Sequence, residues 1–256
     1  AGIQADIKTM CANHVFATSA ITALTAQNTL GVTGIMEVTP EFLGVQLDAV
    51  FADIYPDAVK IGMVSSSDLI RMIASKLQEY KAANIVVDPV MGDHGHAYET
   101  YTPEMCEQMK ELVCMADVVL PNVTECCILT DTPYKEENWT RKELLNMAMM
   151  LRLMGAKSVV ITGVREGSCY TNVVLEQGQY DAKFIRTRSS GVERPGTGDV
   201  FSSVVAGALL NGKSLPEAVS QAAGFVKECI KVSDEEQIPH ANGVCFEKIL
   251  GKLIKK

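Results

Sequence analysis

The sequence has little positive charge, no long hydrophobic run and no CxxC motif. Lys and Arg number 23 against 31 Asp and Glu, a net charge of -8, and basic residues cluster only at the terminal stretch 252–256. This balance argues against nucleic-acid binding. Because no apolar run approaches the ~20 residues of a membrane span and no signal peptide opens the chain, we expect no membrane association. Eight cysteines without CxxC spacing indicate reduced residues of a cytoplasmic protein.

The order of sequence patterns predicts one α/β domain over residues 1–256. Short β-branched runs alternate with segments whose apolar residues recur at helical spacing, which is typical of a mostly parallel sheet with helices on both faces. The predicted strands span residues 16–24, 58–63, 84–90, 117–120 and 158–162. Residues 168–188 form two β-rich runs around a turn, which predicts antiparallel strands at the sheet edge.

Helix starts are marked by capping residues. Thr39 and Thr102 each precede a proline that would occupy the first helical position, and Thr140 and Ser214 each precede a glutamate by three residues. Two other phosphate-binding signatures, the Walker lysine loop and the protein-kinase glycine loop with its His-Arg-Asp motif, are missing. Any phosphate site is therefore of another kind.

The run Gly196-Thr197-Gly198-Asp199 joins a glycine-rich turn to the start of an apolar-periodic helix. Glycines let backbone N–H groups close around an anion, and the helix N-terminus adds roughly half a positive charge. Asp199 lies where a carboxylate could take a proton from an attacking hydroxyl. The pattern predicts a phosphoryl-transfer site, and the alternative is a helix with an ordinary Gly-Asp cap.

Polar residues also follow the other predicted strands, at the edge where an open α/β sheet binds ligands. Asn122 and Glu125 enter a helix three residues apart, where Asn122 could bind a phosphate oxygen and Glu125 could hold magnesium through water. The alternative is an asparagine cap followed by a first-turn glutamate. Asp88 and the pair Thr162-Gly163 could be turn residues, but their joint position favours a functional role.

These motifs, in this order and at this spacing, resemble the ribokinase superfamily over nearly the whole chain. The matching motifs are Asp88-Pro89-Val90-Met91, Asn122-x-x-Glu125, Thr162-Gly163 and Gly196-Thr197-Gly198-Asp199. The stretches 1–9 and 20–29 are similar to the hydroxymethylpyrimidine and phosphomethylpyrimidine kinases of thiamine synthesis. The resemblance implies a three-layer α/β/α ribokinase-like fold with a mostly parallel central sheet, antiparallel edge strands and a homodimeric assembly.

The resemblance also implies ATP as co-substrate, Mg²⁺ and a small aminopyrimidine alcohol, 4-amino-5-hydroxymethyl-2-methylpyrimidine or its monophosphate. Asp6, Gln27 and Met63 then line the alcohol pocket, where the two polar side chains can bind ring nitrogens and an amine. Asp199 is the expected base, and the Gly196, Thr197 and Gly198 N–H groups stabilise the transferred phosphoryl. ATP is assigned to the residues Asn122, Thr162, Gly163 and Asp88, and magnesium to Glu125.

Two departures leave the substrate open. The pyrimidine kinases usually carry Cys where this chain has Asp199, and the second half, including Glu193-Arg194-Pro195, is similar to bacterial pyridoxal or pyridoxamine kinases. The same-class alternative is therefore a kinase of pyridoxal, pyridoxine or pyridoxamine in vitamin B6 salvage. An alternative of another class is a non-catalytic ligand-binding protein on a kinase scaffold.

The start of the chain differs from the family pattern. In the family, a first strand and a Gly/Ser-rich turn precede the stretch that matches residues 1–4, and the sequence contains neither. We expect either a chain trimmed at its start or a sheet that lacks one central strand. Such a gap would expose apolar surface and unpaired strand edges.

Overall fold

A computed structural model describes residues 2–254. Residues 1, 255 and 256 lie outside it, so the first residue of the stretch 1–9 and the last two of the basic stretch 252–256 are not described. Its centre is a six-stranded sheet in the order β10-β9-β8-β7-β4-β3. Four strands run parallel: β3 (Val59–Ile61), β4 (Ile85–Val87), β7 (Val118–Val119) and β8 (Ser158–Glu166). The antiparallel edge is formed by β9 (Cys169–Leu175) and β10 (Lys183–Arg188), as predicted.

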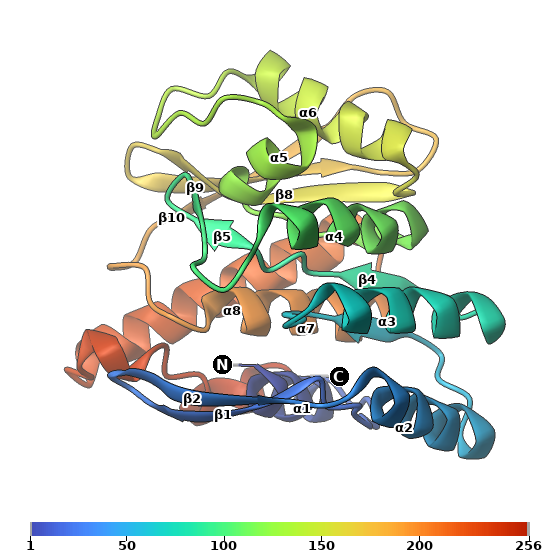
Figure 1. Cartoon of the computed structure of the whole chain (residues 1–256). Coiled ribbons are helices and arrows are strands. Elements are labelled where there is room, and N and C mark those ends of the chain that lie inside the picture. The colour runs from blue at the N-terminus through green and yellow to red at the C-terminus, as the bar shows by residue number, and fades with distance from the viewer. Residues whose placement is uncertain (1, 255–256) are drawn as a thin grey trace.

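Helices cover both faces of this sheet, so the structure confirms the three-layer fold (Figure 1). Alternate residues of a strand point to opposite faces, and Val87 packs in one hydrophobic core while Val86 packs in the other. One core takes residues from α2 (Pro40–Asp53), α3 (Ser67–Glu79), α4 (Pro103–Met115), α5 (Val123–Thr130) and α6 (Arg141–Met154). The other takes residues from α1 (Ile3–Ala12), α7 (Thr197–Leu210), α8 (Leu215–Glu235) and the short 3-10 helix Glu247–Lys252.

The capping residues start the helices as predicted. The Thr39 hydroxyl accepts the Phe42 N–H at 3.2 Å, and the Thr102 hydroxyl accepts the Met105 N–H at the same distance. Thr140 and Glu143 form a complete capping box at the start of α6. None of the helices within residues 2–254 combines the length and apolar character that a bilayer span requires.

The prediction of a strand over residues 16–24 is wrong. Residues 15–22 are irregular, Phe16 is 77% exposed, and the strand that begins at Ala23 belongs to a separate hairpin of β1 (Ala23–Asn28) and β2 (Gly31–Glu37). A strand needs a neighbour for its backbone groups. A cavity of about 2060 Å³ is instead lined by both this segment and β3, which pairs only with β4 among the described residues.

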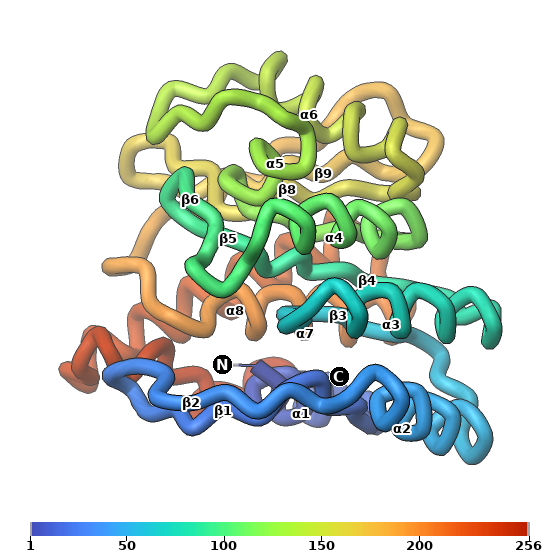
Figure 2. The backbone as a smooth tube through the Cα atoms, in the orientation of Figure 1, coloured from blue at the N-terminus to red at the C-terminus, as the bar shows by residue number. Residues whose placement is uncertain are grey.

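The hairpin, α1 and α2 thus form one side of the molecule, and α5 and α6 lie at the opposite side (Figure 2). A second small hairpin, β5 (Gly92–Asp93) with β6 (His96–Ala97), follows β4. The polar residues that follow β4 and β7 lie between these two regions, next to the starts of α5 and α7. The sheet therefore brings the predicted motifs to one edge.

Candidate active site

The glycine turn forms the N-terminus of α7, as the sequence predicts. Gly196 is the N-cap residue, and its φ of 86° is a left-handed conformation that glycine adopts without strain. Asp199 lies in the first helical turn, whose N–H groups have no partner within a helix. A Cβ atom added at Gly198 would have no atom within 4 Å beyond its chain neighbours and its own helix backbone, so this face of the turn is open. The turn has the backbone geometry of an anion site.

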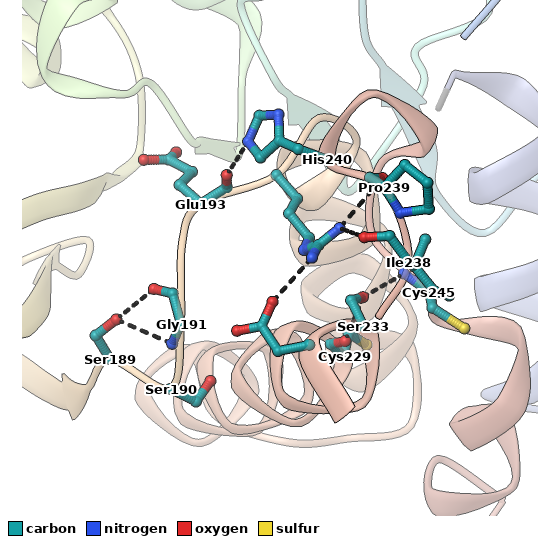
Figure 3. A network of polar contacts seen from close by, with 12 residues as sticks. Ser189, Ser190, Gly191, Glu193, Cys229, Ser233, Ile238, Pro239, His240 and Cys245 are labelled. Atoms are coloured by element: carbon teal, nitrogen blue, oxygen red, sulfur yellow. Dashed lines mark hydrogen bonds and ion pairs between the residues drawn. The ribbon is translucent and has the colours of Figure 1, made fainter. Parts of the chain in front are cut away.

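The segment that leads into this turn is fastened to the C-terminal part of α8 (Figure 3). Arg194, 7% exposed, donates to Asp234 Oδ1 at 2.8 Å and to the carbonyl oxygen of Ile238 at 2.9 Å. The His240 ring donates to the Glu193 carbonyl oxygen at 2.7 Å. These contacts fix the backbone on the amino side of the glycine turn.

The residue before the turn touches residues 243–244, which follow the short 3-10 helix His240–Asn242 after α8. The Val244 N–H donates to the Pro195 carbonyl oxygen at 3.1 Å. Gly243, with a φ of 78°, lies so close that a Cβ there would be 2.9 Å from the same oxygen. The Thr197 hydroxyl donates back to the Arg194 carbonyl at 3.1 Å, so its side chain is engaged within the loop.

Asp199 has two neighbours that fix its carboxylate. The backbone N–H of Gly2, the N-cap residue of α1, donates to Asp199 Oδ2 at 2.7 Å. Lys60 Nζ lies 3.8 Å from Asp199 Oδ1. The carboxylate therefore lies where α1, β3 and α7 meet, with 19% of its side chain exposed to solvent.

Asp6 belongs to the same cluster of charges. Lys60 Nζ donates to both of its carboxylate oxygens, at 2.9 and 3.0 Å, and the Ser203 hydroxyl donates to Oδ1 at 2.7 Å. The Asp6 side chain is 18% exposed, whereas that of Lys60 is 3% exposed. A buried ammonium with two carboxylates around it satisfies the rule that buried charges are paired.

Asp88 is the most buried of these carboxylates. Its side chain follows β4, is 7% exposed, and accepts the Ser202 hydroxyl at 2.8 Å. Burial raises the pKa of Asp88 to about 6, while the charge of Lys60 and the Ser202 hydrogen bond act to lower it. Asp88 thus contacts the first turns of α7 from the sheet side.

Asn122 and Glu125 form a capping box at the start of α5. The Asn122 side chain accepts the Glu125 N–H and Glu125 Oε2 accepts the Asn122 N–H, both at 2.8 Å. Glu125 Oε1 accepts the Met91 N–H at 3.1 Å, which ties the box to the loop after Asp88. Burial, with the charge of Asp88, raises the pKa of Glu125 well above its usual range. These contacts are the ones expected of the alternative, an asparagine cap followed by a first-turn glutamate. The metal role of Glu125 stays a prediction.

Thr162 and Gly163 do not end a strand, because β8 continues to Glu166. They form an irregularity between Ile161 and Val164, where Gly163 has a φ of 68°. Thr162 pairs with Asn122 in an isolated parallel bridge. The residues assigned to ATP from two neighbouring strands are therefore side by side.

The residues assigned to the alcohol lie around the cavity beside β3. Asp6, Gln27 and Met63 all line it, and so does Asp199. Gln27 comes from the hairpin, where its Oε1 accepts the Thr25 hydroxyl at 3.3 Å, and Met63 is 48% exposed. The structure thus brings Asp199, the predicted base, and the predicted alcohol-binding residues to one cavity.

Sequence reasoning missed Lys60, Ser202 and Ser203. A signal was present for Lys60, because it is the one charged residue in the apolar run 58–63, and a buried strand carries a charge only when a partner neutralises it. The two serines left no such signal. Their positions in α7 became meaningful only when the fold placed Asp6 and Asp88 against that helix.

Comparison with known sequences gives a consistent group of relatives. The family described as phosphomethylpyrimidine kinase matches residues 1–245. The hydroxymethylpyrimidine/phosphomethylpyrimidine kinase of Bacillus subtilis is 38% identical over 237 residues, which cover 90% of this chain and 84% of that protein. The thiamine biosynthesis bifunctional protein ThiED of Geobacter sulfurreducens is 37% identical over 91% of this chain, which spans 47% of that longer protein.

Solved structures extend the likeness to a second group of kinases. A candidate phosphomethylpyrimidine kinase from Bacteroides thetaiotaomicron has a TM-score of 0.91 at 26% identity, and the match covers 99% of this chain and 89% of that protein. Another crystal form of the same protein, with pyridoxal, has a TM-score of 0.89. The pyridoxal kinase of Lactobacillus plantarum has a TM-score of 0.87 at 25% identity, covering 97% of this chain and 90% of its own.

Proposed function

The chain belongs to the phosphomethylpyrimidine kinase family, and we propose that it transfers the γ-phosphoryl group of ATP to the hydroxymethyl group of 4-amino-5-hydroxymethyl-2-methylpyrimidine in thiamine biosynthesis. One observation carries the proposal. Asp199, in the first turn of α7 beside the glycine turn, lines the same cavity as Asp6, Gln27 and Met63. A base, a phosphate-binding turn and an alcohol pocket therefore adjoin. The monophosphate of the same alcohol is the second proposed substrate.

Asp199 acts as the general base in this proposal. Its carboxylate accepts the proton of the hydroxymethyl O–H while that oxygen forms a bond to the γ-phosphorus. The bond from the γ-phosphorus to the β–γ bridging oxygen breaks, and ADP leaves with that electron pair. The Gly2 N–H, which donates to Asp199 Oδ2 at 2.7 Å, holds the carboxylate in place before the alcohol arrives.

The glycine turn stabilises the transferred group. Negative charge spreads over the phosphoryl oxygens during transfer, and N–H groups at a helix N-terminus stabilise such charge when they are fixed in advance. The open face at Gly198 provides the space, because a Cβ there would have no atom within 4 Å apart from its chain neighbours and the backbone of its own helix. The Arg194 and His240 contacts keep the turn in position.

In this proposal, ATP and magnesium bind the residues that follow β4 and β7 and the irregular part of β8. Asn122, Thr162, Gly163 and Asp88 would contact the nucleotide, and Glu125 would order water around the metal. Between residues 2 and 254, no group of three or more His, Cys, Asp or Glu side chains has a geometry suited to a metal ion. A magnesium ion held mainly by phosphate oxygens and water, as its small radius favours, is compatible with such a site. When bound, the ion would neutralise phosphate charge.

The alcohol pocket combines polar partners with an apolar face. The Asp6 carboxylate accepts and the Gln27 amide both donates and accepts, which suits ring nitrogens and an exocyclic amine. Met63 offers a polarizable surface for a flat ring. Gln27 comes from the hairpin, so the pocket is completed by a segment outside the central sheet.

A vitamin B6 kinase is the second candidate, because a specific observation favours it. Pyridoxal also presents a hydroxymethyl group on a flat heteroaromatic ring, and the Bacteroides structure with pyridoxal superposes on 99% of this chain. The chain also has Asp199 where the pyrimidine kinases usually carry cysteine. Pyridoxal, pyridoxine and pyridoxamine are therefore the substrates to compare.

Formation of ADP tests the proposal against a non-catalytic binding protein. The purified chain with ATP and Mg²⁺ is expected to release ADP when the pyrimidine alcohol is added and to release little without it. Binding of ATP without ADP release under either condition would instead support a ligand-binding protein on a kinase scaffold. The same assay with pyridoxal measures the second candidate.

We also propose a homodimer in the cytoplasm. Both strands of the β1–β2 hairpin are exposed, and Leu24 and Met36, which face each other across it, are 48% and 61% exposed. A second copy that covers this hairpin would bury apolar side chains beside the Gln27 pocket. All eight cysteines are free thiols, which suits a reducing compartment.

A further inference from the structure

Lys60 is a buried charge that the proposed chemistry does not yet use. It is the middle residue of β3, and its side chain is 3% exposed. Its ammonium donates to both carboxylate oxygens of Asp6, at 2.9 and 3.0 Å, and lies 3.8 Å from Asp199 Oδ1. One cation thus contacts both a residue of the alcohol pocket and the base.

The surroundings of Lys60 keep it charged. Burial acts to lower the pKa of Lys60, but the charges of Asp88, Asp6 and Asp199 outweigh burial, so the pKa lies above its usual value. These three carboxylates come from the end of β4, from α1 and from α7, the elements packed around the ammonium. A single cation therefore balances a cluster in which the carboxylates would otherwise repel one another.

The backbone beside Lys60 leaves space for its ammonium. A Cβ atom added at Gly62 would lie 3.2 Å from Lys60 Nζ, and no other side chain or backbone atom beyond its chain neighbours lies within 4 Å of that position. An alanine here would displace the ammonium by a few tenths of an ångström and keep its charge. Gly62 has no left-handed φ, so the substitution carries no backbone strain.

We propose that Lys60 is a positioning residue for phosphoryl transfer. Its ammonium holds the Asp199 carboxylate at a fixed distance from Asp6, and therefore from the alcohol that Asp6 binds. This inference rests on the proposed kinase function, with Asp199 as the base. Lys60 acts through the two carboxylates: the Gly2 N–H fixes Asp199 Oδ2, and the ammonium faces Oδ1. Without it, repulsion from Asp6 and Asp88 would move the base away from the hydroxyl.

The test compares three variants with the wild-type enzyme. Lys60→Gln removes the charge, Gly62→Ala moves it, and Lys183→Gln removes an exposed lysine from the ion pair with Glu176 on the far edge of the sheet as a matched control. For each folded variant, kcat, KM for ATP and the alcohol, and the pH dependence of kcat/KM are measured. Circular dichroism and thermal unfolding report folding separately.

We expect Lys60→Gln to lower kcat by ~10- to 100-fold, the scale of a misplaced base, with each KM within about threefold of wild type. The acidic limb of its kcat/KM profile moves to higher pH, because a cation is lost beside three carboxylates. Gly62→Ala gives a smaller loss of kcat, and Lys183→Gln matches wild type. A purely structural lysine would change thermal stability but neither kcat per folded molecule nor the pH profile.

Unchanged kcat and pH profile in folded Lys60→Gln would overturn the proposal. If that variant does not fold, Gly62→Ala decides alone, and an unchanged kcat there overturns it equally. The wild-type rate reports on the proposed kinase function, whereas the ratio of variant to wild-type rates reports on Lys60. A wild-type chain that forms no ADP with any of the alcohols would overturn the kinase function and, with it, the role of Lys60. An active wild-type enzyme with an unchanged Lys60→Gln variant would overturn the role of Lys60 alone.

Discussion

The Ser202 hydroxyl donates a hydrogen bond of 2.8 Å to Asp88 Oδ2 and so joins α7 to the end of β4. Both side chains are buried, at 1% and 7% exposure. This contact places the glycine turn of α7 against the sheet, one helical turn from Asp199. The proposed base therefore lies in a helix that is held by a buried carboxyl with a pKa of about 6.

The first prediction concerns that charge. Burial raises the pKa of Asp88 to about 6, so Asp88 binds its proton more tightly in the folded state than in the unfolded state. The stability that this adds is present below about pH 4 and is lost as the pH rises through about 6. Relative to Asp88→Asn, the wild-type free energy of unfolding should fall by up to about 3 kcal/mol across that window. Urea unfolding of both proteins at pH 4, 5, 6 and 7 measures the difference, and parallel pH curves would contradict it.

The second prediction concerns the base. Asp199→Asn keeps the shape of the side chain and an oxygen that can accept the Gly2 N–H, but it removes the capacity to take a proton. Turnover should fall by ~10² or more, while the affinities for ATP and alcohol, measured by calorimetry, stay nearly unchanged. Retained turnover would show that another group accepts the proton.

The third prediction separates the two roles of Glu125. Both of its oxygens accept backbone N–H groups, from Met91 and Asn122, and Glu125→Gln leaves one of these without an acceptor. Stability should fall by about 1–3 kcal/mol whichever role is correct. If Glu125 also orders magnesium waters, the magnesium concentration for half-maximal rate rises, and the KM for the alcohol does not.

Glu143→Gln is the matched control for that prediction, because Glu143 forms the same capping box at the start of α6. It should lose stability without any shift in the magnesium titration. Coincident magnesium curves for Glu125→Gln and wild type would reject the metal role and leave Glu125 as a capping residue.

The fourth prediction concerns the hairpin. Leu24→Asp places a charge on the exposed apolar side chain opposite Met36, so it should convert the proposed dimer to monomer in sedimentation velocity. Leu153→Asp, at an 86% exposed position on α6, is the control and should leave the dimer intact. A Leu24→Asp protein that sediments as wild type would place the interface elsewhere.

The sequence was sufficient where local chemistry determines structure. Thr39 and Thr102 cap their helices as predicted, and Gly196 to Asp199 form the start of α7, because capping and left-handed turns depend on a few adjacent residues. The strand predicted over 16–24 failed because strand formation depends on a neighbour that no local pattern specifies. The periodicity of apolar residues indicates whether a segment prefers to form a strand, but it does not indicate which strand would pair with it.

The same distinction explains the site. Asp88 and Asp199 could be found from motifs. Their contacts could not, because Ser202 lies far in the sequence from Asp88, and Gly2 and Lys60 lie far from Asp199. A lysine inside an apolar strand signals a buried partner without naming it. Which carboxylates surround it follows only from the packing of α1 and α7 beside β3.

The central claim is most directly tested by internal competition. The enzyme is given ATP, Mg²⁺ and an equimolar mixture of the pyrimidine alcohol and pyridoxal, and the two phosphorylated products are quantified by mass spectrometry at low conversion. Their ratio equals the ratio of the two kcat/KM values, independent of enzyme concentration and folding. The account predicts an excess of the pyrimidine phosphate. An excess of pyridoxal phosphate would contradict it and assign the chain to vitamin B6 salvage.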